Sequence, residues 1–358
     1  MKILYAIQGT GNGHLSRARD VIPCLQLKGD VDILVSGSQA DVDLPFPVKY
    51  RLKGLSFIFG KKGGVDLVET YKKGNLKRLY KEIKSLPVSD YDIVINDFEP
   101  VTAWACYLKH KSCISLSHQS AVLNKKSPKP AKSDAIGKAI LKNYAPVSEH
   151  YGFHFKTYDT NIFTPVIRQQ VRDMEAKSKD HYTVYLPAYD DQTIINILKE
   201  AKDVDWEIFS KHSTEKYSYK NFIVKPVTNE AFLKSLATCK GILCGAGFET
   251  PAEAIFLKKK LMVIPMKNQY EQQCNAAALE QMDVPVIKSL KKKYISEIND
   301  WIKSDDVIHI AYKNNLQEVI DLIFERHASS PNVAPLLSMI LKDSKKSFLN
   351  NVFLKSGM

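Results

Sequence analysis

The sequence lacks any apolar run of the roughly 18 residues that a membrane-spanning helix needs. Its six cysteines form no Cys-x-x-Cys pair and stand mostly in apolar segments. We therefore expect buried free thiols in a reducing compartment rather than disulfides or a zinc site. The first residues run into glycines too soon to form a signal peptide, and neither solenoid-type repeats nor long low-complexity tracts occur. These absences predict a cytoplasmic protein.

Acidic residues are also in short supply. The chain has 51 lysines and arginines against 39 aspartates and glutamates, which gives a formal net charge of +12. Such an excess attracts an anionic partner, which can be a nucleic acid, a membrane surface or a phosphorylated substrate. No helix-turn-helix, zinc finger or aromatic RNA-binding motif accompanies the charge, so no nucleic acid partner is expected.

Much of the positive charge gathers in two segments, residues 53–84 and 124–142. Each is either a solvated surface or part of an acceptor-side face that meets an anionic membrane or a phosphorylated carrier. The apolar residues 57–59, which precede Lys61 and Lys62, favour a membrane contact, which would place the protein peripherally at the inner face of a membrane. The tail, residues 329–358, mixes apolar and basic residues and leaves open whether it packs as a helix or contacts a membrane or partner.

What the sequence does contain is a regular alternation of short apolar strands and helices. With 358 residues and 44% hydrophobic composition, the chain is long enough for two domains with cores of their own. The alternation runs from Lys2 to Phe155 and restarts at Tyr182, which predicts the α/β class with two Rossmann-like parallel sheets. We place the hinge in the polar, proline-ended connection formed by residues 159–165.

The second half holds a turn that suits a phosphate. An apolar strand ends in Gly245-Ala246-Gly247, and after Phe248 a helix is expected to open with Thr250 as its N-cap and Pro251 at its first position. A turn without large side chains lets a ligand approach the backbone closely. The N–H groups at the start of the helix offer hydrogen bonds and a partial positive charge.

Carboxylates and amides that suit hydroxyl groups follow this turn. Glu253 lies one turn into the first helix, and the next strand leads to Glu271, Gln272 and Asn275. The whole stretch resembles the donor-binding signature of glycosyltransferases with the GT-B fold. It is most similar to the UDP-glycosyltransferases and to the peptidoglycan lipid-intermediate N-acetylglucosaminyltransferases. In those families a Glu six residues after the last Gly holds the ribose, as Glu253 follows Gly247, and an acidic-or-Gln, Gln pair before Asn-Ala contacts the donor sugar.

The resemblance implies a set of donor-binding residues: Gly245, Ala246, Gly247, Phe248, Thr250, Glu253, Val227, Glu271, Gln272 and Asn275. Val227 belongs to a loop that would lie against the nucleobase of the donor. One departure concerns residues 187–190, Pro-Ala-Tyr-Asp, where relatives often carry a small Gly-Gly-Ser type turn that touches the diphosphate.

The first strand ends in a second glycine turn, Gly9-Thr10-Gly11-Asn12-Gly13-His14. Dinucleotide binding is disfavoured because His14 stands where the third glycine would be and because no acidic residue follows the next strand. His14 either hydrogen-bonds the turn or acts on a substrate. In the families that the chain resembles, the same loop ends in a histidine that acts as base or orients the acceptor hydroxyl. The resemblance therefore implies that His14 is catalytic and that Gly11, Asn12 and Gly13 lie on the acceptor side.

Further polar groups follow the fourth and fifth strands of the first half. Asp97 can orient an imidazole, accept the proton of an acceptor hydroxyl, or cap the helix expected near Pro100. Glu99 and His118 are candidates for the acceptor side, His118 through a partial match to a His-Glu-Gln-Asn run of the peptidoglycan enzymes. Because the carboxyl ends of parallel strands share one crevice, we expect these groups to converge with His14.

The resemblance covers the chain to about residue 326 and implies GT-B architecture, with two Rossmann-like domains facing a central cleft. The expected domains are an acceptor-side domain (1–156), a nucleotide-sugar domain (157–310) and C-terminal helices (311–358) that cross back to the first domain. The implied function is that of an inverting glycosyltransferase, which moves a sugar from a nucleoside-diphosphate donor to a hydroxyl acceptor. UDP is the nucleotide expected first. A lipid-linked or cell-envelope glycan is one candidate acceptor.

No Asp-x-Asp stands at a strand end in a metal-binding position, so neither a metal nor a cofactor is expected. Two other functions remain open for the same fold. One is a UDP-sugar 2-epimerase, which needs no acceptor, and the other is a non-catalytic nucleotide-sugar-binding protein.

Overall fold

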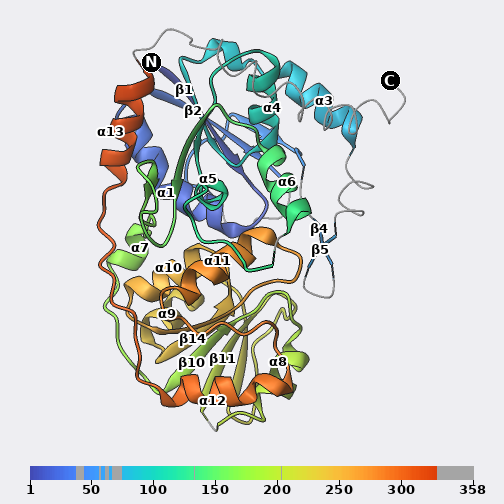
Figure 1. The fold of residues 1–358 in the computed structure, drawn as a ribbon, viewed down its shortest axis with the longest axis vertical. Coiled ribbons are helices and arrows are strands. Elements are labelled where there is room, and N and C mark those ends of the chain that lie inside the picture. Colours follow the sequence, from blue (N-terminus) through green and yellow to red (C-terminus); the bar gives the residue numbers. More distant parts are fainter. Residues whose placement is uncertain are drawn as a thin grey trace.

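A computed structural model describes residues 1–37, 44–55, 58–60, 64–66, 75–132, 134–202 and 204–328. It shows two α/β domains stacked along the long axis of the molecule (Figure 1). Phe57, Lys61, Lys62 and the side chains of Ile58 and Phe59, for which a membrane contact was expected, lie outside the described residues, as does the tail 329–358, whose role was left open. No helix in the described part of the chain is both long and apolar enough to cross a bilayer.

The first domain is built on a parallel sheet with the strand order β3-β2-β1-β6-β7-β8-β9. β1 is an interior strand, between β2 and β6, and is buried from Ile3 to Gln8, which explains why its sequence is apolar on both faces. The strand order reverses between β1 and β6, and ligands bind at such a point in doubly wound sheets. The strands are β1 (Lys2–Gln8), β2 (Asp30–Ser36), β3 (Tyr50–Leu52), β6 (Ile93–Asp97), β7 (Ile114–Leu116), β8 (Glu149–Phe153) and β9 (Ile162–Phe163), and a separate antiparallel pair consists of β4 (Ile58–Gly60) and β5 (Gly64–Asp66).

Helices cover both faces of this sheet (Figure 1). Four of them begin with side-chain caps that the sequence supplies, and two of these four flank the carboxyl edge of the sheet. Glu99 caps α4, with Pro100 at the first helical position, and Ser117 caps α5 by accepting the N–H of Ser120. The helices of this domain are α1 (Asn12–Gln26), α3 (Leu76–Ser85), the 3-10 turn η1 (Val88–Asp90), α4 (Pro100–Leu108), α5 (His118–Leu123) and α6 (Ala135–Tyr144).

The first sheet extends beyond the boundary expected at residue 156. β9 pairs with β8 through Gly152 with Ile162 and Phe153 with Phe163, so the connection expected to be the hinge carries the edge strand of the first sheet. A short helix, α7 (Gln169–Arg172), follows before the second domain begins. A two-residue strand gives no periodic signal in the sequence, because only its pairing with β8 makes it a strand.

The second domain repeats the doubly wound pattern with the strand order β12-β13-β11-β10-β14-β15, in which β12 alone is antiparallel to its neighbour. Its order again reverses, between β10 and β14. The strands are β10 (His181–Tyr185), β11 (Asp205–Ser210), β12 (Tyr217–Tyr219), β13 (Phe222–Pro226), β14 (Gly241–Gly245) and β15 (Lys260–Ile264). The helices are α8 (Asp191–Leu198), α9 (Asn229–Thr238), α10 (Glu249–Phe256), α11 (Tyr270–Glu280), the 3-10 turn η2 (Lys292–Tyr294) and α12 (Ile295–Lys303).

The two domains meet where the helices α10 and α11 face the first domain (Figure 1). α11 packs against α5 and α6. The last described helix, α13 (Leu316–His327), lies against α1 of the first domain. A salt bridge of 2.7 Å joins Lys28 to Asp321, and a contact of 2.8 Å joins the Tyr151 hydroxyl to His327 Nε2. The carboxyl edges of both sheets therefore face a common space between the domains.

Candidate active site between the domains

A cavity of about 1060 Å³ lies between the domains. This volume is at the upper end of small-molecule sites and leaves room for two substrates. Both domains contribute to its walls. The lining residues that the sequence singled out are Gly11, Asn12, Gly13, His14, His118, Val227, Gly247, Phe248, Thr250, Glu253, Glu271 and Gln272.

His14 stands at the lip of the cavity, in the first turn of α1. Its Nδ1 donates to Asp97 Oδ1 over 2.8 Å. Asp97 is the last residue of β6 and pairs in register with Ile7 of β1, so the two neighbouring strands hold the carboxylate directly behind the imidazole. Asp97 is fully buried, whereas the His14 side chain keeps 14% of its surface exposed. The carboxylate thus sets the tautomer of His14 and leaves Nε2 directed at the cavity.

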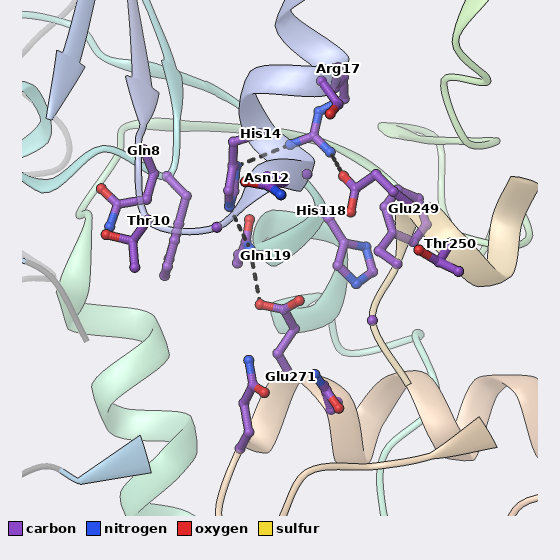
Figure 2. Close-up of a pocket in the computed structure, with 18 of the residues that line it drawn as sticks. Gln8, Thr10, Asn12, His14, Arg17, His118, Gln119, Glu249, Thr250 and Glu271 are labelled. Carbon is purple, nitrogen blue, oxygen red and sulfur yellow. Dashed lines mark hydrogen bonds and ion pairs between the residues drawn. The ribbon is translucent and has the colours of Figure 1, made fainter. Parts of the chain in front are cut away.

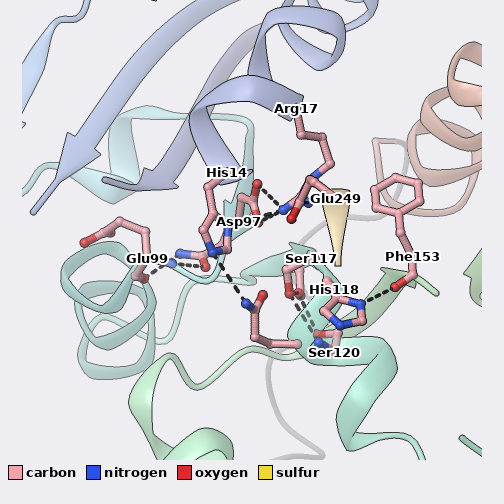
Figure 3. Close-up of polar contacts among 12 residues, drawn as sticks. His14, Arg17, Asp97, Glu99, Ser117, His118, Ser120, Phe153 and Glu249 are labelled. Carbon is pink, nitrogen blue, oxygen red and sulfur yellow. Dashed lines mark hydrogen bonds and ion pairs between the residues drawn. The ribbon is translucent and has the colours of Figure 1, made fainter. Parts of the chain in front are cut away.

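Arg17 is the second partner of Asp97. Its Nη2 donates to both carboxylate oxygens over 2.7 and 2.8 Å, and its Nη1 donates to Glu249 of the second domain (Figure 3). Burial raises the pKa of Asp97, but Arg17 and His14 lower it more, so this carboxyl has a pKa below its ordinary value. Burial lowers the pKa of His14, but the Asp97 charge and hydrogen bond outweigh it, so the imidazole pKa lies above its ordinary value.

Gln119 connects His14 with the second domain (Figure 2). Its Nε2 donates to Glu271 Oε2 over 2.9 Å and lies 3.4 Å from His14 Nε2. Glu271 belongs to the first turn of α11. The His14 imidazole, the Gln119 amide and the Glu271 carboxylate therefore form a continuous chain of polar contacts across the cavity, from the first domain to the second.

The glycine turn and the start of α10 form the opposite wall. A methyl group added at Gly247 would meet no described atom within 4 Å, so this backbone is open to the cavity. α10 begins at Glu249 with Phe248 in the N-cap position, and no side chain in the described part of the chain caps it. The first N–H groups of α10 are thus available to an anion in the cavity.

Two further side chains on this wall already have partners. Glu253 is 2% exposed and receives hydrogen bonds from Arg168, Nε over 2.5 Å and Nη2 over 2.7 Å. Gln272 Oε1 accepts the backbone N–H of Met266 over 2.9 Å. Burial raises the pKa of Glu253 more than Arg168 lowers it. Arg168 also lines the cavity and is ion-paired with this carboxylate.

Comparison with protein families gives one family model that matches residues 1–304, described as glycosyl transferase family 1. The match covers most of the 358 residues. The chain belongs to this glycosyltransferase family. Comparison with curated proteins finds no match.

Solved glycosyltransferases share the fold of this family member. UGT89C1 of Arabidopsis thaliana, complexed with UDP, is 11% identical with a TM-score of 0.54, covering 92% of this chain and 94% of that one. MurG of Acinetobacter baumannii is 14% identical with a TM-score of 0.51, and the match covers 90% of this chain and 99% of MurG. A UDP-glucosyltransferase of Polygonum tinctorium is 10% identical with a TM-score of 0.55, and the match covers 95% of this chain and 97% of that enzyme. The GT-B architecture predicted from the sequence is thereby confirmed, and the protein is a glycosyltransferase.

Some residues that were predicted for the site of this glycosyltransferase do not reach the cavity. Glu99 is wrong as an acceptor-side residue, because it is fully buried and its carboxylate accepts the N–H groups of Val101 and Thr102 and the hydroxyl of Ser36. Thr250 is wrong as an N-cap, because α10 starts one residue before it, although Thr250 lines the cavity. The others outside the lining are Asp97 behind His14, Gly245 and Ala246, which are the first two residues of the glycine turn, and Asn275, which is fully buried.

Sequence reasoning assigned no catalytic or binding role to three residues of the site, Arg17, Gln119 and Arg168, although Gln119 was among the polar groups after the fifth strand that were expected to converge with His14. Arg17 had a usable signal, because it follows His14 by three residues and therefore shares its helix face. Gln119 follows the strand β7 and stands next to a predicted residue, His118. Arg168 had no such signal, since its partner Glu253 lies in another element 85 residues away.

Proposed function

We propose that this glycosyltransferase moves a sugar from a UDP-linked donor to a hydroxyl group of an acceptor, with inversion at the anomeric carbon. The observation that carries the proposal is the pair formed by His14 and the buried Asp97 at the lip of the cavity, with Nε2 of His14 directed at the space between the domains. A histidine held in this tautomer is a general base for a hydroxyl group at neutral pH.

The proposed chemistry uses the two walls of the cavity. The acceptor oxygen attacks the anomeric carbon from the face opposite the diphosphate, and His14 Nε2 takes the hydroxyl proton. The bond from the anomeric carbon to the phosphate oxygen breaks, and negative charge grows on the departing diphosphate. The N–H groups at the start of α10 and the open backbone at Gly247 are positioned to stabilise that charge.

UDP is proposed as the nucleotide on two grounds. The spacing from Gly247 to Glu253 and the pair Glu271-Gln272 resemble the UDP-sugar signature, and all four residues line the cavity. UGT89C1, which shares the fold, has been solved with UDP and with UDP-L-rhamnose. The proposed reaction needs no metal or cofactor, so a chelator should leave turnover unchanged.

The acceptor side of the cavity supports an acceptor that carries both hydroxyl and apolar groups. Among the described residues, five buried polar atoms of cavity-lining side chains have no hydrogen-bond partner: Gln8 Oε1, Thr10 Oγ1, Arg17 Nε, Gln119 Oε1 and Gln269 Oε1. Hydroxyl groups of an acceptor would satisfy them. Ile136, Ile140 and Leu141 of α6 also line the cavity and add apolar surface. A glycan on an apolar carrier combines both properties.

The proposal places the enzyme in the cytoplasm, at the inner face of an anionic membrane. Ile136 is 70% exposed at the edge of the cavity, and α6 also carries Lys138 and Lys142. Exposed apolar and basic side chains on one short helix suit the headgroup region. Sedimentation with vesicles rich in anionic lipid, compared with neutral vesicles, tests this part, and equal recovery from both would contradict it.

Ligand binding and product analysis test the proposed function. In a thermal-shift screen of nucleotides and nucleotide sugars, UDP compounds should raise the melting temperature, since a ligand at 100 times its Kd adds about 2.7 kcal/mol to the unfolding free energy. With a matching acceptor the wild-type enzyme should release UDP and glycosylate the acceptor with inverted configuration. His14→Ala should still bind UDP and lose roughly 10²–10⁴-fold in turnover.

The other outcomes separate the alternatives. An isomeric UDP-sugar formed without acceptor would show a 2-epimerase. Tight UDP binding with neither transfer nor hydrolysis over a broad acceptor panel would show a nucleotide-sugar-binding protein. Turnover of His14→Ala equal to that of the wild type would remove His14 from the mechanism.

A further inference from the structure

His118 lies between the domains, with a hydrogen-bond acceptor at each ring nitrogen. Nδ1 is 2.8 Å from the carbonyl oxygen of Phe153, and Nε2 is 2.7 Å from Oδ1 of Asn275 in the second domain (Figure 3 shows the first contact). The ring stacks on Phe248, with centroids 3.9 Å apart and planes 5° apart. His118 is 1% exposed, so water does not replace these partners.

The orientation of Asn275 is fixed by a third contact. Its Nδ2 donates to the carbonyl oxygen of Ala246 over 3.1 Å, which leaves Oδ1 facing His118. Rotating the amide would give His118 a donor but would set two oxygens against each other at Ala246. Ala246 is the middle residue of the glycine turn, so His118 and Asn275 together support the wall at which the diphosphate is proposed to bind.

All of these contacts can be hydrogen bonds only when His118 carries two N–H groups. A carbonyl oxygen only accepts, and a neutral imidazole has a single N–H. In the neutral form one of the two contacts, to Phe153 or to Asn275, is therefore an unfavourable pair of acceptors. In the charged form every contact is satisfied. The bonding pattern therefore favours the imidazolium form.

The surroundings of His118 have opposing effects on its pKa. Burial lowers the pKa of His118 below its ordinary value, whereas Glu271 of α11 and Glu249 of α10 oppose this effect. The neighbouring His154, whose ring lies 5.1 Å away, accepts the N–H of Phe155 at Nδ1 over 2.9 Å and is therefore neutral. Burial also holds the pKa of His154 well below its ordinary value. His118 is thus the histidine of this pair whose hydrogen bonds require a second proton.

We propose that His118 takes up a proton when the anionic diphosphate of a donor binds beside Phe248, and that the charged ring then holds Asn275 and the glycine turn in place. This rests on the proposed function, which supplies the diphosphate. The negative charges of the ligand add to those of Glu249 and Glu271 and stabilise the imidazolium. His118 is a positioning residue in this arrangement, since it contacts the turn through Phe248 and Asn275.

The linkage has a definite sign. The complex binds more protons than the free enzyme, so donor affinity falls as pH rises, by up to about tenfold per pH unit between the free and bound pKa of His118. Below the free pKa, which burial depresses, the ring is already charged and the linkage disappears. Affinity should therefore be highest on the acidic side of neutrality.

Isothermal titration with UDP tests the proposal. Titrations in two buffers of very different ionisation enthalpy, at one pH near neutrality, give the number of protons taken up. Wild-type enzyme should take up more protons than His118→Gln, by roughly half a proton or more per UDP bound. The amide introduced by this substitution would donate to Asn275 without titrating, so UDP affinity should be retained within a few-fold. His309→Gln, which changes an exposed histidine outside the cavity, should behave as wild type.

UDP and His14, whose pKa is raised by Asp97, can also exchange protons on binding, but their contribution is common to the wild type and His118→Gln and cancels in the difference. Equal proton uptake by these two proteins overturns the inference while leaving UDP as the donor nucleotide. No binding of UDP or of other nucleoside diphosphates by the wild type overturns the proposed donor and the linkage with it. If His118→Gln does not fold, nitrogen-15 NMR of labelled histidine decides the matter, because His118 must show N–H at both ring nitrogens in the UDP complex.

Discussion

At the residue scale, the site is organised by one buried carboxylate with two cationic partners. Asp97 accepts from His14 Nδ1 and from Arg17 Nη2, and none of its surface is exposed. Arg17 supplies a permanent positive charge that keeps Asp97 ionised. Asp97 in turn keeps His14 basic despite burial. The strength of the proposed base therefore depends on a group that does not touch the cavity.

Replacing Asp97 tests this dependence. In the wild type, His14 is charged below its raised pKa, so the acidic limb of the kcat/KM profile should lie above the ordinary histidine value. Asp97→Asn removes the charge that raises this pKa and leaves burial to lower it, so the limb should move to lower pH. The weaker, less well-oriented base should reduce kcat/KM at its optimum by roughly 10²–10⁴-fold.

The matched control for that variant lies just before the start of the same strand. Asp92 is exposed and accepts the backbone N–H of Lys2 over 2.7 Å, so Asp92→Asn should leave the pH profile unchanged. If the acidic limb of the kcat/KM profile does not move in Asp97→Asn, a group other than His14 controls that limb.

At the element scale, the junction of β14 and α10 sets the proposed diphosphate site. The helix begins without a side-chain cap from any described residue, and the turn before it presents bare backbone to the cavity. A helix whose first N–H groups have no side-chain cap is less stable than a capped one. At the start of α10 these N–H groups face the cavity, so a bound anion could accept their hydrogen bonds.

Gly247→Ala tests whether the backbone at this turn must be bare. An added Cβ meets no described atom, and Gly247 is absent from the residues with positive φ, so the unfolding free energy should change by no more than about 0.5 kcal/mol. The methyl group would stand where the phosphate approaches, so UDP should bind roughly tenfold more weakly, a loss of about 1.4 kcal/mol. Gly247→Val should bind still more weakly. Titration calorimetry with UDP and denaturant unfolding measure the two effects, and undiminished binding in both variants would place the diphosphate elsewhere.

The elements themselves were largely predictable, because buried parallel strands are uniformly apolar. The first strand was expected directly before the glycine turn that starts at Gly9, and β1 spans Lys2–Gln8. β9 was missed because pairing with β8, not its own sequence, makes it a strand. The start of α10 was misplaced because Thr-Pro is a strong local signal for a helix start. The ring of Phe248 packs on His118 and Phe155, and this tertiary contact fixes the start of the helix earlier.

The site residues were predictable where they stand at strand ends and not where they depend on distant partners. The sequence left three roles open for Asp97, and the structure shows it orienting His14, while Glu99 caps the helix. Neither the pairing of Arg168 with Glu253 nor that of His118 with Asn275 leaves a mark in the sequence, because each joins elements far apart along the chain.

At the scale of the whole molecule, several polar contacts between the two domains gather around the cavity. Gln119 reaches Glu271, His118 reaches Asn275, and Arg17 reaches Glu249. Each pair joins the first domain to α10 or α11 of the second. Of these six residues, all but Asn275 also line the cavity, so we expect ligand binding and domain arrangement to be coupled.

Glu249 gives this coupling a measurable consequence. Its carboxylate stands in the first turn of α10, binds Arg17 of the other domain and packs against Gly13, where an added Cβ would lie 2.5 Å from Oε2. The start of α10 and the guanidinium of Arg17 would both attract a phosphate, and Glu249 already supplies them with a negative charge. A diphosphate must therefore compete with, and is repelled by, this carboxylate.

Glu249→Gln should consequently bind UDP more tightly than the wild type, by roughly five- to thirtyfold, since it removes a charge repulsion of about 1–2 kcal/mol at the cavity wall. The gain should shrink as salt is added, because the effect is electrostatic. Glu280→Gln, on the exposed end of α11, removes the same charge from the same domain and should leave UDP affinity unchanged. Titration calorimetry at two ionic strengths measures both. Weaker UDP binding by Glu249→Gln would show that the ion pair with Arg17 is needed to shape the site, and that the carboxylate does not compete with the phosphate.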